Sequence, residues 1–141
     1  MARIRSGLVL WLVLLIPTAV SAEGERLAGF KDRMVDVEGG RLCCAHRPGD
    51  GPTLLLIPGT FSDSRVYAKM IPHLDKDLNL LILENRGLGK SWPPPENGSI
   101  EQCAGDALQV ADKLKLATFY IGGHSLGGMI SLEVGRRAPQ R

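Results

Sequence analysis

Apolar residues concentrate in short runs that are separated by turn-forming glycines and prolines. Residues 53–57 and 80–83 consist almost only of leucine and isoleucine, with no alternation between apolar and polar positions. Strands of this kind are covered on both faces, as in a parallel sheet with helices on either side. Residues 118–121 form a shorter β-branched and aromatic run, which predicts a third strand.

Two extended segments, residues 33–37 and 41–47, flank Glu38-Gly39-Gly40 and predict an antiparallel hairpin. Three further segments have apolar residues at helical spacing: residues 66–74, 100–114 and 126–137. The alternation of strands and helices predicts an α/β fold, in which an N-terminal hairpin precedes three parallel strands joined by right-handed crossover helices.

Two local sequence signals indicate where the predicted helices end or begin. Pro72 is expected to end the regular turns of the first one, because proline lacks an N–H donor. Ser99, with Gln102 three residues later, matches a capping box and predicts the start of the second helix. Asn97-Gly98-Ser99 also matches a glycosylation acceptor, but we favour the cap because that acceptor pattern is short and common.

The first 22 residues resemble a secretory signal peptide. Arg3 and Arg5 precede the apolar run 8–16, and small residues stand at Val20 and Ala22. An uncleaved N-terminal anchor is the alternative, although nine apolar residues are too few to span a bilayer, which needs roughly 20. We therefore expect a secreted or periplasmic domain over residues 23–141.

The charge balance excludes some classes of partner. The chain carries a formal charge of +2, and both surplus basic residues lie in the predicted leader, so residues 23–141 are neutral. Nucleic acid calls for a basic face, and anionic membranes attract polybasic segments, so neither is expected as a partner. Cys43, Cys44 and Cys103 are odd in number and two are adjacent, so we expect buried thiols, with one disulfide to Cys103 as the alternative.

Gly123-His124-Ser125-Leu126-Gly127 is the sharpest chemical motif. A nucleophilic serine must project from a cramped turn between a strand and a helix, and glycines on both sides let the neighbouring backbone pack closely. The predicted strand and helix on either side of Ser125 supply that context. The alternative is a tight turn with no chemistry, in which Gly123 and Gly127 serve packing alone.

A second glycine turn, Pro58-Gly59-Thr60, follows the first buried strand. A serine hydrolase with parallel strands places an oxyanion-hole donor at this point, and its other donor directly follows the nucleophile. The candidate donors are the backbone N–H groups of Thr60 and Leu126. An ordinary strand-to-helix turn is the alternative.

These motifs, together with the Arg86–Ser91 stretch and Arg136-Arg137-Ala138-Pro139, resemble the α/β-hydrolase family, in particular its esterase-like serine hydrolases. The resemblance implies an acyl-Ser125 intermediate, a small acyl substrate and no cofactor or metal. Serine at the nucleophile position argues against the family's dehalogenases and epoxide hydrolases. Two departures stand out, since Pro58 replaces a usual histidine and Asn85 precedes Arg86 where an Asp-x-Arg or Asp-Arg pattern is common.

The rest of a catalytic triad is missing. In this family the acid and the histidine follow the serine in chain order, but after Ser125 the chain has Glu133 and no histidine. His46, His73 and His124 are not expected to serve as the base. We therefore expect a truncated, N-terminal part of an eight-stranded fold that is inactive alone. The alternative is a non-catalytic exported fragment or one half of a complementing pair, and the oligomeric state stays open.

Overall fold

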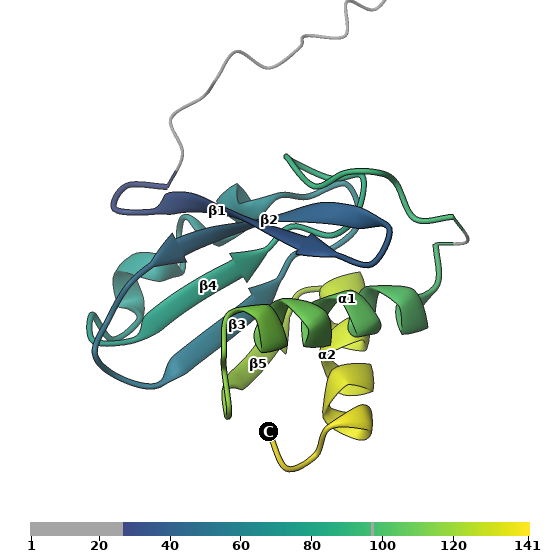
Figure 1. Cartoon of the computed structure of the whole chain (residues 1–141). Helices are drawn as coiled ribbons and strands as arrows, with labels where there is room; N and C mark the ends of the chain where they lie inside the picture. The colour runs from purple at the N-terminus through teal and green to yellow at the C-terminus, as the bar shows by residue number, and fades with distance from the viewer. Residues whose placement is uncertain (1–26, 97) are drawn as a thin grey trace, which may run out of the picture.

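The computed structural model describes residues 27–96 and 98–141, so the predicted leader and Asn97 lie outside the described residues. Its centre is a five-stranded mixed sheet with the strand order β1-β2-β4-β3-β5 (Figure 1). The strands are β1 (Lys31–Val37), β2 (Gly40–Arg47), β3 (Thr53–Ile57), β4 (Asn79–Leu83) and β5 (Tyr120–Gly123). The predicted hairpin and the three parallel strands are confirmed.

Pairing partners fix which strand ends meet. The β1–β2 hairpin is antiparallel, and β2 also pairs antiparallel with β4. Strand β3 pairs parallel with β4 on one side and with β5 on the other. Because these three strands run the same way, the loops that follow Ile57, Leu83 and Gly123 gather at one edge of the sheet.

Each face of the sheet has its own apolar layer, as the unbroken runs predict. Leu81 and Leu83 point into the layer under the two helices, α1 (Ile100–Lys113) and α2 (Leu126–Arg137). Leu80 and Ile82 point into the opposite layer, which Phe30, Tyr67 and Ile71 complete. None of the helices in the described part of the chain is long and apolar enough to cross a membrane.

The helix expected over residues 66–74 is not an α-helix. Two short 3₁₀ helices, η1 (Ser64–Tyr67) and η2 (Ile71–His73), occupy this segment instead. Pro72 lies inside η2, and a residue without an N–H cannot extend an α-helical ladder across the junction. Strand β5 also begins and ends two residues later than predicted, because its register is set by pairing with β3, from Leu54↔Tyr120 to Ile57↔Gly123.

The predicted cap of α1 is confirmed. The Ser99 hydroxyl accepts a hydrogen bond from the Gln102 backbone N–H at 3.1 Å. The reciprocal bond of a capping box is not made through the Gln102 side-chain oxygen, which is buried without a partner among the described residues. The side-chain oxygen of Ser99 alone therefore accounts for the start of the helix.

None of the three cysteines forms a disulfide and all are buried, so the alternative of a disulfide is wrong. Cys43 and Cys44 lie on opposite faces of β2, and Cys103 packs in the layer under α1. Burial, followed by the influence of the neighbouring Cys43, raises the pKa of the Cys44 thiol to about 12. The thiolate, which is the reactive form, is therefore scarce at neutral pH in the folded chain.

We predict that the thiols are protected by the fold. At pH 8 the native chain should react slowly with 5,5′-dithiobis(2-nitrobenzoate), whereas the chain in 6 M guanidinium should release three equivalents of thionitrobenzoate at once. Absorbance at 412 nm measures both reactions. Rapid release from the native chain would contradict the buried positions.

A buried ion pair joins three segments that are far apart in the sequence. The Arg86 guanidinium donates to both carboxylate oxygens of Asp106 on α1, at 2.6 and 2.8 Å. It also donates to the backbone oxygens of Glu38 and Gly39 in the hairpin turn. Both paired side chains are about 95% buried, with 4% and 5% exposed, and the hydrogen bond to Asp106 raises the pKa of Arg86. The pair therefore fixes the loop after β4 against the hairpin and α1.

Replacing Arg86 should cost far more stability than replacing an exposed partner in an ion pair. Arg86→Ala leaves the Asp106 carboxylate buried and unpaired, so we expect a loss of about 3–5 kcal/mol in the free energy of unfolding. The Lys90 side chain is 57% exposed and forms an ion pair with Asp32. Lys90→Ala should therefore lower the free energy of unfolding by only about 0–1 kcal/mol. Urea denaturation measures both, and equal losses would contradict the assignment.

Candidate active site

The nucleophile candidate lies at the sheet edge where the parallel strands end. Ser125 stands between β5 and α2 with φ 53° and ψ −121°, a conformation that non-glycine residues rarely adopt. The residue is exposed, and its hydroxyl has no hydrogen-bond partner within the described chain. Strain of this kind persists only where the surrounding structure enforces it.

The glycines of the motif lie at positions where a side chain would not fit. A Cβ on Gly127 would lie 1.9 Å from the Ile57 carbonyl oxygen, and one on Gly123 would lie 2.2 Å from the Gly127 carbonyl carbon and oxygen. Real carbon atoms do not approach backbone this closely. Both glycines therefore allow the elbow to press against the end of β3, as the motif predicts.

The turn after β3 lies directly against the elbow. A Cβ on Gly59 would lie 3.2 Å from the Ser125 Cβ and 3.0 Å from the His124 carbonyl oxygen. Thr60 follows Gly59 and is exposed, and its N–H finds no acceptor within residues 27–96 and 98–141. Leu126 is the first residue of α2, where backbone N–H groups have no partner inside the helix, and its N–H is also without an acceptor there.

The structure places none of the three histidines as a base for Ser125. His46 Nε2 is hydrogen bonded to Asn79 Oδ1 at 2.8 Å, at the opposite end of β4. His73 ends η2 on the surface. The His124 ring lies beside Gly59 and makes no hydrogen bond to the Ser125 hydroxyl.

Glu133 is part of α2 and belongs to an ion-pair cluster. Arg136 and Arg137 each donate to its carboxylate at 2.7 Å. These hydrogen bonds lower the pKa of Glu133 to about 2. The Glu133 side chain is only 15% exposed, so it is an ion-paired residue of α2 rather than the solvated helix residue expected from the sequence.

Sequence reasoning missed the side chains that hold the candidate oxyanion turn. Tyr67 donates its hydroxyl to the Ile57 carbonyl at 2.7 Å, and Asn85 Nδ2 donates to the Pro58 carbonyl at 3.0 Å. Burial raises the pKa of Tyr67, which keeps its phenol protonated as the donor. No spacing in the sequence signals these contacts, because each joins residues that only the folded sheet brings together.

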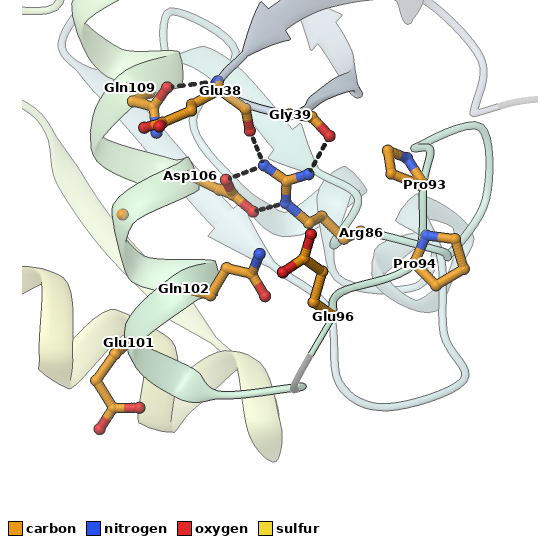
Figure 2. Close-up of a pocket in the computed structure, with 11 residues that line it drawn as sticks. Glu38, Gly39, Arg86, Pro93, Pro94, Glu96, Glu101, Gln102, Asp106 and Gln109 are labelled. Atoms are coloured by element: carbon orange, nitrogen blue, oxygen red, sulfur yellow. Dashed lines mark hydrogen bonds and ion pairs between the residues drawn. The ribbon is translucent and has the colours of Figure 1, made fainter.

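A pocket of about 440 Å³ lies elsewhere at the same edge, between the hairpin turn and the first half of α1 (Figure 2). Its polar lining includes Glu38, Glu96, Glu101 and the Arg86–Asp106 pair. None of the predicted site residues lines it. Among the described residues no group of histidine, cysteine, aspartate or glutamate side chains could hold a metal ion.

Comparison with known proteins identifies the family of the fold. A family model described as alpha/beta hydrolase fold matches residues 52–141. A protein from Rhizobium rhizogenes that is named as a carbamate hydrolase, RutD, is 33% identical over 92 residues, which are 64% of this chain and 35% of that protein. A fluoroacetate dehalogenase from Burkholderia sp is 31% identical over 105 residues, 71% of this chain and 34% of that protein.

Solved structures show the same fold. The crystal structure of E-2-(acetamidomethylene)succinate hydrolase superposes with a TM-score of 0.71 at 26% identity, over 78% of this chain and 41% of that one. This chain spans about a third of the length of the curated relatives that it matches. The chain therefore belongs to the α/β-hydrolase family and carries the N-terminal portion of its fold.

Proposed function

We propose that the chain supplies the nucleophile and the oxyanion hole of a serine hydrolase that cleaves a carboxylic ester or a related acyl bond. The observation that carries this proposal is the strained, exposed Ser125, which packs against the Gly59 turn and directly precedes Leu126, while the N–H groups of Thr60 and Leu126 find no acceptor within the described residues. Hydrogen-bond donors that point at the oxygen where negative charge develops supply the largest single part of transition-state stabilisation in many acyl-transfer enzymes.

In the proposed reaction the Ser125 oxygen attacks the carbonyl carbon of the substrate. The resulting oxyanion accepts hydrogen bonds from the Thr60 and Leu126 N–H groups, and collapse of the intermediate releases the alcohol and leaves an acyl-Ser125 ester. Water then cleaves that ester and restores the serine. A base must take the Ser125 proton and pass it to the leaving alcohol.

We propose that this base comes from polypeptide outside residues 1–141, because no histidine of the described chain is hydrogen bonded to the Ser125 hydroxyl. The exposed edge of the sheet supports such a partner segment. Within the described residues β5 pairs only with β3, and Tyr120 on β5 and Leu132 on α2 are 66% and 77% exposed. One half of a complementing pair is accordingly the second candidate function.

The names of the relatives support cleavage of an acyl bond as a broader class of reaction, of which ester hydrolysis is one case. One is named for carbamate hydrolysis and the superposed structure for hydrolysis of an acetamido compound. The dehalogenase shares the fold, but a serine hydroxyl at position 125 fits attack on a carbonyl carbon. We also propose export to a secreted or periplasmic location, on the basis of the N-terminal leader.

Covalent labelling tests the proposed nucleophile. At pH 9, where hydroxide from solvent takes the Ser125 proton and fluoride leaves, a fluorophosphonate probe should modify the folded chain at Ser125 at least about tenfold faster than the heat-unfolded chain, because the two N–H groups stabilise the phosphonyl oxygen. Peptide mass spectrometry identifies the labelled residue. Ser125→Ala should abolish labelling, whereas Thr118→Ala, which removes an exposed hydroxyl before β5, should leave it unchanged.

Absence of labelling in both the native chain and Ser125→Ala would contradict a formed nucleophile site. It would favour the non-catalytic alternative, in which the elbow glycines serve packing alone. Equal labelling of native and unfolded chain would show that the fold does not activate Ser125.

A further inference from the structure

The segment that carries Thr60 is held at both ends by two consecutive residues that follow β4. Asn85 Nδ2 donates to the Pro58 carbonyl at 3.0 Å, at the start of the segment. The Glu84 carboxylate accepts from the Ser64 hydroxyl at 3.1 Å and from the Ser64 N–H at 3.4 Å, at its end. Glu84 and Asn85 are 2% and 6% exposed, so water competes little for these bonds.

The segment between these anchors needs restraint. Gly59 precedes Thr60, and glycine leaves the backbone free to rotate the following peptide group. Phe61, which follows Thr60, has φ 56° and a side chain that is 93% exposed, so packing of the ring does not offset the unfavourable backbone conformation. The conformation is therefore maintained by contacts to the backbone on either side.

Hydrogen bonds hold the carbonyl groups on both sides of the Gly59 Cα, and together they limit rotation of the peptide that carries the Thr60 N–H. Asn85 fixes the carbonyl of the Pro58–Gly59 peptide, and the Ser62 N–H donates to the Gly59 carbonyl at 3.3 Å. In a trans peptide the carbonyl and the N–H point in opposite directions. Fixing the Gly59 oxygen therefore directs the Thr60 N–H to the other side of that peptide.

We propose that Asn85 is a positioning residue for the oxyanion hole, which acts through Pro58 and Gly59 on the Thr60 N–H while Glu84 fixes the far end of the segment. The inference rests on the proposed function for the use of that N–H. It assigns a role to the position where this chain departs from the family's pattern before Arg86.

A boronic acid measures the oxyanion hole without turnover, because it forms a reversible tetrahedral adduct with a serine oxygen. We expect phenylboronic acid to bind the full chain and not Ser125→Ala, by ¹¹B NMR titration. Asn85→Leu removes the amide donor at similar size and should raise the dissociation constant at least about tenfold, less than the roughly 10²–10³-fold effect on kcat of removing an oxyanion donor outright. Asn85→Ser, a smaller change, should raise it too.

Asn79, on the strand that precedes Asn85, provides a matched control. It lies at the start of β4, its Nδ2 donates to Thr53 Oγ1 at 2.8 Å and its Oδ1 accepts from His46 Nε2 at 2.8 Å, so Asn79→Leu also loses side-chain hydrogen bonds. The melting temperature of Asn79→Leu should fall as much as that of Asn85→Leu. Its affinity for phenylboronic acid should stay within about twofold of that of the unmodified chain, because Asn79 lies away from the Thr60 segment.

Amide resonances of Thr60 in ¹H–¹⁵N spectra provide a readout that needs no ligand. In Asn85→Leu or Asn85→Ser the Thr60 resonance should shift or broaden, whereas Asn79→Leu should leave it in place. An unchanged Thr60 resonance in the Asn85 variants overturns the inference whether or not boronate binds.

The binding data separate the two proposals. Failure of phenylboronic acid to bind the unmodified chain contradicts the proposed function. Binding that Asn85→Leu and Asn85→Ser leave unchanged, or that Asn79→Leu weakens equally, overturns the positioning role of Asn85 while the proposed function stands.

Discussion

The elbow and the end of β3 approach so closely that no side chain fits between them. A Cβ on Gly127 would overlap the Ile57 carbonyl, and one on Gly59 would crowd the elbow at Ser125. Backbone against backbone at this distance fixes the relative position of two turns that are more than 60 residues apart. The candidate nucleophile, both candidate N–H donors and the strain at Ser125 all depend on that contact.

Buried polar groups hold the loops around this contact. Arg86 ties the loop after β4 to α1 and to the hairpin turn, and Glu84 and Asn85 tie the same loop to the segment after β3. A buried polar group without a partner is costly, so each of these contacts favours one arrangement over its alternatives. These contacts restrain the described parts of two neighbouring loops at the carboxyl edge, neither of which contains an α-helix or a strand among the described residues.

The division of roles at this edge explains how one fold serves relatives with different names. The sheet and the glycine turns determine where a nucleophile stands, and the residue at that position determines which bond it attacks. In this chain the residue is Ser125, the nucleophile that we propose, and the proposed oxyanion donors are the N–H groups of Thr60 and Leu126. The acidic pocket beside Arg86 lies outside that arrangement and shares none of its predicted residues.

The sequence by itself determined the features that depend on neighbouring residues. Unbroken apolar runs predicted β3 and β4, helical spacing with Ser99 predicted α1, and the glycines around Ser125 predicted a strand-to-helix elbow. Only the tertiary structure decided the rest. The later start of β5 and the hydrogen bonds of Asn85 and Arg86 arise from pairing and packing between distant segments, and no local sequence pattern predicts such contacts.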